Sequence, residues 1–171
     1  VKRALAKAGL EPVAVGLVER NSVDVAAAVQ AVTAAKPDAV VQISAYKSCA
    51  AFIRAARKAG YGGTFYNVSF VGTQALADEL GKEGNGVMVS QVMPFPFNTT
   101  TGIARDYLDA IKHSNGKHQA NYSGMEGYVA ARVFAEGLRR TARPATREGF
   151  ITAIEGMQRL DGAGGKHHAD H

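Results

Sequence analysis

The sequence contains only one cysteine, Cys49, and no tryptophan. A single cysteine excludes a disulfide within the chain and a zinc site made of several cysteines. No apolar run approaches the ~20 residues that a helix needs to cross a membrane, so the chain is not expected to be membrane-embedded. Hydrophobic residues make up 46% and charged residues 20% of the 171 positions, which is typical of one globular domain or two small lobes.

Sequence motifs of common enzyme and nucleotide sites are missing as well. There is no G-x-S-x-G nucleophile turn, no H-E-x-x-H zinc motif and no phosphate loop that ends in Lys-Ser or Lys-Thr. Gly81, Gly84 and Gly86 have the spacing G-x-x-G-x-G, but a strand is predicted after them, where a phosphate site needs a helix N-terminus. Without paired carboxylates, or a nucleophile next to a base, we expect no enzyme and no cofactor.

The charged residues do not form a patch that would favour a nucleic-acid partner. The net charge is +5, but the basic residues are scattered, and most lie near the predicted end of a helix, where cations are favourable. Near the C-terminus, His167, His168, Asp170 and His171 are of types that ligate transition metals. They follow a glycine-rich segment that gives them no fixed geometry, so no metal site is expected.

Helices and strands are predicted to alternate along the first half of the chain. The run Ala39–Ile43 is apolar and β-branched, as in a parallel strand with helices on both faces. A helix follows it, with one apolar stripe at Cys49, Phe52, Ile53, Ala56 and Ala59. This alternation predicts an α/β fold with a mainly parallel sheet flanked by helices. The expected helices cover residues 2–8, 25–35, 44–59 and 73–80, and the expected strands residues 13–18, 39–43, 64–68 and 87–92.

The pattern changes at residues 93–98, where Pro94 and Pro96 cannot belong to a central strand. Beyond this segment three helices are predicted, over residues 100–114, 123–140 and 147–157, the last started by Thr146. We therefore divide the chain into an α/β ligand-binding lobe that lacks its first strand, a hinge crossing, a helical return into a second, largely missing lobe, and a disordered tail. These parts cover residues 1–92, 93–98, 99–161 and 162–171.

Ligands of parallel sheets bind beyond the carboxyl ends of the strands, which directs attention to two short segments. Ala45 and Tyr46 follow one predicted strand and open a helix, so free backbone N–H groups there can hold a carboxylate. The Tyr46 ring can cover an apolar ligand group, although a tyrosine packed at the strand end is an equally good interpretation. Ser69 and Phe70 occupy the equivalent position after the next strand. Tyr122 is a third aromatic candidate.

The order of these elements is similar to that of a known family. Residues 36–96, from KPDAVVQISAYKS to SQVMPFP, resemble the C-terminal lobe of type I periplasmic solute-binding proteins. The branch most like it is the leucine/isoleucine/valine-binding group, which serves ABC importers. Residues 121–158, NYSGMEGYVAARVFAEGLRRTARPATREGFITAIEGMQ, resemble the closing helices of that family. The resemblance covers about residues 1–161 and depends on many weakly specific positions in the right order.

The resemblance implies two lobes that close on a small ligand, a periplasmic location and a membrane permease of an ABC importer as partner. Carried over by position, Ala45, Tyr46, Ser69 and Phe70 would face the ligand, and Tyr122 would lie near the crossing between the lobes. Members that bind amino acids usually carry an acidic residue where Ser69 stands, which pairs with the ligand's ammonium. Its absence indicates a carboxylate ligand without an amino group, because a buried unpaired ammonium is costly.

Compared with the family, the chain lacks almost all of the N-terminal lobe, the strand expected before Lys2 and the strand expected after Asp161. Most residues that grip the ligand's carboxylate belong to the missing part. The same fold also serves as the ligand-sensing domain of regulators and signalling receptors, which is the alternative function. An enzyme on an open α/β sheet is a third hypothesis, and the lack of a reactive constellation speaks against it.

Overall fold

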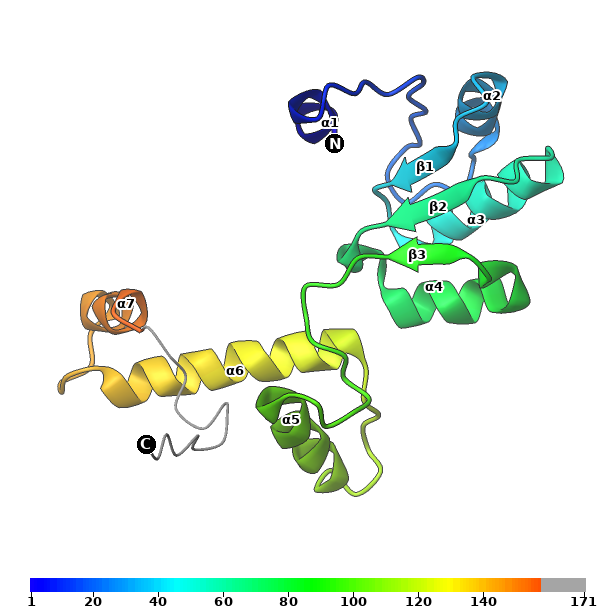
Figure 1. The fold of residues 1–171 in the computed structure, drawn as a ribbon. Coiled ribbons are helices and arrows are strands. Elements are labelled where there is room, and N and C mark those ends of the chain that lie inside the picture. The colour runs from blue at the N-terminus through cyan, green and yellow to red at the C-terminus, as the bar shows by residue number, and fades with distance from the viewer. Residues whose placement is uncertain (158–171) are drawn as a thin grey trace, which may run out of the picture. The chain divides into compact units, whose positions relative to one another are not determined.

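A parallel sheet of three strands is the centre of residues 1–92 in the computed structural model (Figure 1), which describes residues 1–157. The strands are β1 (Ala39–Gln42), β2 (Thr64–Asn67) and β3 (Val87–Val89), in that order across the sheet. β1 pairs with β2, and β2 with β3, in parallel. Parallel neighbours need crossover connections, which helices supply here. The predicted α/β fold with a mainly parallel sheet is confirmed.

Residues 1–92 form one compact unit, and a second unit begins at Met93. The helices of the first unit are α1 (Lys2–Lys7), α2 (Ala26–Ala34), α3 (Tyr46–Lys58) and α4 (Thr73–Leu80). Two short 3-10 helices, η1 (Ser69–Val71) and η2 (Gly81–Gly84), flank α4. The hinge role of residues 93–98 stays a prediction, and the tail at 162–171 lies outside the described residues.

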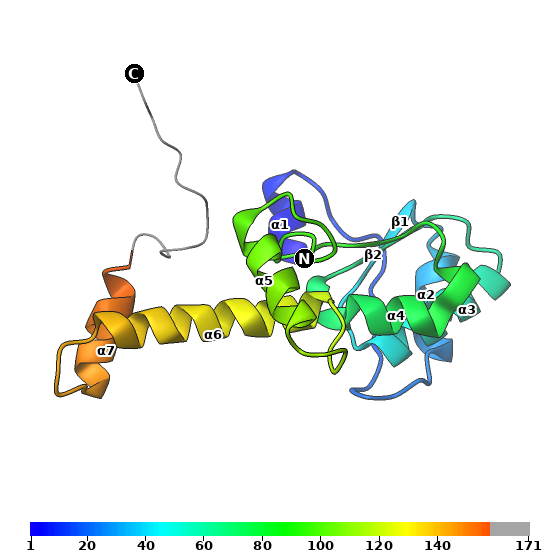
Figure 2. The same ribbon diagram turned by 90° about the horizontal axis from the view of Figure 1, so that it is seen from below.

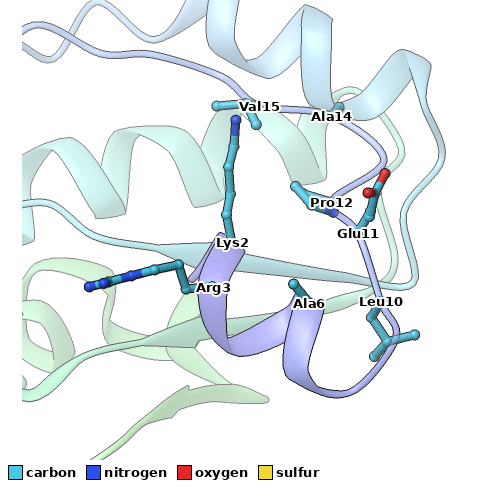
Figure 3. Close-up of a pocket in the computed structure, with 8 residues that line it drawn as sticks. All are labelled: Lys2, Arg3, Ala6, Leu10, Glu11, Pro12, Ala14 and Val15. Carbon is cyan, nitrogen blue, oxygen red and sulfur yellow. The ribbon is translucent and has the colours of Figure 1, made fainter.

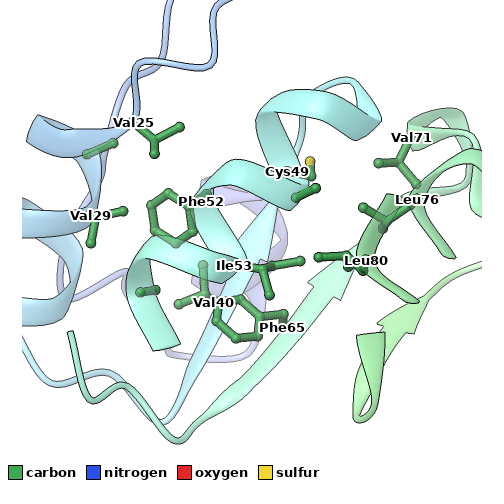
Figure 4. Packing of buried hydrophobic residues seen from close by; sticks show 13 residues of the cluster. Val25, Val29, Val40, Cys49, Phe52, Ile53, Phe65, Val71, Leu76 and Leu80 are labelled. Carbon is green, nitrogen blue, oxygen red and sulfur yellow. The ribbon is translucent and has the colours of Figure 1, made fainter. Parts of the chain in front are cut away.

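The core of the first unit lies between the sheet and the helices α2, α3 and α4 (Figures 1 and 4). Four members of the predicted α3 stripe are buried, and Ala59, the fifth, is exposed. Phe52 and Phe65 meet edge to face, with ring centroids 6.5 Å apart. Burial of this apolar stripe, rather than helix propensity, accounts for most of the stability of α3. The buried members of the stripe are Cys49, Phe52, Ile53 and Ala56.

The second face of the sheet is open in the described residues, which corrects the prediction of helices on both faces. Val41, Tyr66 and Met88 are register partners across the three strands, and they are 49%, 42% and 51% exposed. Side chains alternate along a strand, so their neighbours Val40 and Phe65 point into the core. The continuous apolar run in β1 was therefore a poor guide to how many faces are covered.

The predicted strand at residues 13–18 is also wrong for this structure, because the segment has no strand hydrogen bonds. It instead approaches α2 closely: a Cβ on Gly16 would lie 2.9 Å from the Cβ of Ala28. Val13 and Leu17 point away from the core and are exposed, while Val18 packs against it. A β-prone run becomes a strand only where a partner strand accepts its hydrogen bonds.

The second unit consists of α5 (Gly102–Lys112), α6 (Tyr122–Arg140) and α7 (Arg147–Glu155). Thr101, Asn121 and Thr146 cap them: each side-chain oxygen accepts a hydrogen bond from the backbone N–H three residues on. The cap at Thr146 was predicted. The core of the second unit contains Ala104, Tyr107 and Met125. No helix among residues 1–157 combines the length and apolar character needed to cross a membrane.

Candidate functional site

The two segments singled out in the sequence follow neighbouring strands at the same edge of the sheet. Gln42, the last residue of β1, is the register partner of Asn67, the last residue of β2. Because the strands are parallel, Ala45 and Tyr46 leave the sheet at the same edge as Ser69 and Phe70. We call this edge, residues 44–47 together with 69–72, the rim.

On the α3 side of the rim, the N-terminus of α3 has no side-chain cap. Ala45 is the N-cap residue, with φ −73° and ψ 159°, and no side chain accepts from the first backbone N–H groups. Those groups have no partner within the helix and are suited to bind an anion. Tyr46 is half-buried and packs partly against the core, and its contact with a ligand stays a prediction. Its remaining surface faces solvent.

Lys47 adds a positive charge to the rim that sequence reasoning missed. Its Nζ lies over the Tyr46 ring, 6.0 Å from the centroid, and the residue is exposed. The available signal was its position in the first turn of a helix that follows a strand. A cation here, next to free N–H groups, favours an anionic ligand.

The β2 side of the rim is the 3-10 turn η1. Val71 is buried and anchors η1 in the core, which leaves Phe70 63% exposed and Ser69 half-buried. Gly72 follows with φ +81°, a left-handed conformation that residues with a Cβ rarely adopt. The turn thus presents one aromatic ring and one hydroxyl next to each other in sequence.

Tyr122 belongs to the second unit, where it is the first residue of α6 and half-buried. Its ring meets those of Phe95 and Phe97 edge to face, with centroids 6.4 and 6.1 Å apart. Phe95 and Phe97 also contact each other and are about half exposed. Both phenylalanines belong to residues 93–98, the predicted hinge crossing, and were not predicted to contact a ligand.

The Cys49 thiol near the rim is not activated as a nucleophile. Cys49 is buried in the first turns of α3, and burial raises the pKa of its thiol to about 11, so the thiolate is disfavoured at neutral pH. The described residues also contain no cluster of three or more His, Cys, Asp and Glu that could hold a metal ion. The candidate ligands His167, His168, Asp170 and His171 lie outside the described part of the chain.

Two surface hollows of the first unit do not involve the predicted ligand residues. One, of about 510 Å³, lies between α1 and the segment that follows it, with Lys2, Arg3, Glu11 and Val15 in its wall (Figure 3). The other, of about 290 Å³, lies between α4 and β3 and is lined mainly by apolar residues such as Leu76, Leu80 and Val87. The first is open and carries charges of both signs, so it selects no ligand class.

Residues 1–171 match the family described as Periplasmic binding protein. The chain therefore belongs to the periplasmic binding protein family, and the resemblance found in the sequence is confirmed. A search of curated proteins found no match.

Solved structures with the same fold agree with this assignment. A substrate-binding periplasmic protein from Ralstonia solanacearum is 27% identical with a TM-score of 0.83, over 96% of this chain and 47% of that one. A possible leucine/isoleucine/valine-binding protein from Rhodopirellula baltica SH 1 is 28% identical with a TM-score of 0.78, over 87% and 41%. A periplasmic binding protein type 1 from Bordetella pertussis Tohama I, 23% identical, shares the fold with a TM-score of 0.80, over 95% and 46%. The chain spans less than half the length of these structures.

Proposed function

We propose that the chain is part of the substrate-binding component of an ABC importer and that its rim contacts a small carboxylate or amino-acid-like ligand. The observation that carries the proposal is the placement of Ala45–Tyr46 and Ser69–Phe70 at one edge of a parallel sheet. This edge is where ligands bind in open α/β sheets. The rim offers N–H groups, a hydroxyl, aromatic rings and a cation, which suit binding rather than catalysis.

The charge of the rim supports a carboxylate without an amino group. Residues 44–47 and 69–72 contain no Asp or Glu, so nothing in the rim would pair with a ligand ammonium. Lys47 and the uncapped start of α3 instead offer favourable interactions to an anion. The exposed ring of Phe70 and the partly exposed ring of Tyr46 provide apolar surface for an aliphatic or aromatic group.

The partners and location follow from family membership as part of the same proposal. Binding proteins of this kind deliver a solute to a membrane permease, and we place this chain in the periplasm with such a permease as partner. Tyr122 is proposed as a further ligand contact. The alternative, a ligand-sensing domain of a regulator or signalling receptor with the same fold, has the same ligand chemistry and differs in the domain to which it is joined.

Isothermal titration calorimetry with a matched pair of ligands tests the proposal. Leucine and 4-methylpentanoate share a side chain and a carboxylate and differ only in the ammonium. We expect 4-methylpentanoate or an aromatic acid to bind and leucine to bind more weakly, and Lys47→Met to weaken binding of the acid. Binding of leucine with rejection of 4-methylpentanoate would contradict the ligand class, and no binding of any acid or amino acid would contradict the function.

A further inference from the structure

Two amide side chains are buried side by side beneath the rim. Gln42 is 9% exposed and Asn67 is 3% exposed. They are register partners on neighbouring parallel strands, so their side chains leave the sheet on the same face. Each is a buried position in its strand, on the face that the core and the helices cover. The polar pair therefore lies at the carboxyl edge of a mainly apolar core.

The hydrogen-bonding capacity of this pair is largely unused within the protein. Gln42 Nε2 donates to the backbone oxygen of Cys49, in the first turns of α3, over 3.4 Å. Gln42 Oε1 and both amide atoms of Asn67 have no partner among the described residues. Buried amides are almost always hydrogen-bonded, because losing water without a replacement is strongly unfavourable. Three unpaired atoms at neighbouring positions point to one shared partner.

We propose that Gln42 and Asn67 hold a buried water molecule that joins the two halves of the rim. Water donates and accepts, so one molecule can accept from the Asn67 amide nitrogen and donate to Gln42 Oε1. Gln42 connects the site to α3 through its hydrogen bond to the Cys49 backbone oxygen. The backbone oxygen of Asn67 accepts from Ser90 N, just after β3, over 2.9 Å. Gln42 and Asn67 are then positioning residues for Tyr46 and Ser69, which they need not touch.

The water site depends only on the two amides, whereas its importance for ligand binding rests on the proposed function. A direct hydrogen bond from Asn67 Nδ2 to Gln42 Oε1 is the competing arrangement. The structure does not form this bond, because Asn67 Nδ2 and Gln42 Oε1 both lack a partner among the described residues, which favours the water.

A crystal structure of the unliganded chain at about 1.8 Å resolution decides between the two arrangements. We expect an ordered water within about 3.2 Å of both Gln42 and Asn67. Direct contact of the two amides, with no water beside them, would overturn the inference. A water at this position in a chain that binds no acid would overturn only the proposed function, so the two failures are distinguishable.

Hydrogen exchange tests whether the water positions the rim. The Cys49 amide donates to Ala45 O and the Val71 amide to Val68 O, each over 3.0 Å, so they report on the two turns. Asn67→Leu and Gln42→Met each remove the polar pair and are expected to speed exchange about tenfold at both amides. Exchange that accelerates at neither amide, or equally at all core amides, would show that the pair does not act on the rim.

Tyr61→Phe is the matched control for these variants. The Tyr61 hydroxyl is another buried group for which residues 1–157 offer no partner, but it lies just before β2, at the opposite end of the strand from Asn67. Its removal is expected to leave exchange at the Cys49 and Val71 amides unchanged. Acceleration at these amides in Tyr61→Phe would show that any buried polar deletion loosens the rim, which would remove the special role of Gln42 and Asn67.

Discussion

Arg54 on α3 donates a hydrogen bond from Nη1 to Glu79 Oε1 on α4 over 3.0 Å, and its Nε donates to Glu83 Oε2 over 2.7 Å. One guanidinium thus joins two carboxylates from a separate helix and the turn behind it. The hydrogen bonds to Glu83 and Glu79 raise the pKa of Arg54 above its usual value. The side chains of Arg54 and Glu79 are both partly exposed, so solvent and salt weaken the attraction between them.

We expect Arg54→Met to lower the melting temperature by only about 2 °C at low salt, because exposed ion pairs contribute little. The difference from wild type should shrink further in 1 M NaCl, where charges are screened. Thermal denaturation followed by circular dichroism at both salt concentrations measures this. A difference that stays constant or grows with salt would show that Arg54 acts through packing of its alkyl stem instead.

Substitutions on the buried face of α3 should lower the free energy of unfolding far more. Ile53→Ala deletes methylene and methyl groups from a fully buried site and should lower the free energy of unfolding by about 2–5 kcal/mol. Ile43→Ala makes the same change at an exposed position just after β1 and should cost less than about 1 kcal/mol. Urea denaturation of both variants gives the comparison. Equal losses would contradict the placement of the core on one face of the sheet.

The buried Cys49 thiol should make the stability of the fold depend on pH in the alkaline range. Burial raises the pKa of its thiol from 9.0 to about 11, so the folded chain keeps the proton that the unfolded chain loses above pH 9.0. The stabilising contribution is complete below pH 9.0 and is lost as pH rises toward 11. Cys49→Ala should abolish this part of the alkaline destabilisation, which urea denaturation at pH 8, 9 and 10 measures.

Thiol reactivity checks the same burial independently. At pH 8 the folded chain should react with a disulfide reagent such as DTNB at least tenfold more slowly than the urea-unfolded chain, because the thiolate is scarce and shielded. Equal rates in the two states would contradict the buried position of Cys49.

Local patterns in the sequence were sufficient for most helices and for the α/β alternation with a mainly parallel sheet. Spacing identified the buried residues Cys49, Phe52, Ile53 and Ala56, and residue type identified the cap at Thr146. Both features depend on interactions between residues a few positions apart, so they can be inferred from the local sequence. The strand at 13–18 depended on a partner strand, and the coverage of Val41 depended on distant segments, so neither could be settled locally.

The candidate site was likewise predictable where it depends on local features and not where it depends on distant segments. The rim was predictable because strand ends and helix starts are local features, and a parallel sheet brings strand ends to one edge. The burial of Gln42 and Asn67 was not predictable, because it required the register between β1 and β2. The contact of Tyr122 with Phe95 and Phe97 likewise joins segments more than 20 residues apart. The ligand roles of Ala45, Tyr46, Ser69, Phe70 and Tyr122 remain predictions.

Binding of a small acid at the rim is tested most directly by an NMR titration of the ¹⁵N-labelled chain with 4-methylpentanoate and benzoate. The amides of residues 44–48 and 69–72 should shift in a saturable way, and Phe70→Ala should weaken the response. Tyr66→Ala, on the open face of the sheet, should leave it unchanged. No shift with either acid, or shifts confined to residues 60–64 and 84–86 at the opposite edge, would contradict the account.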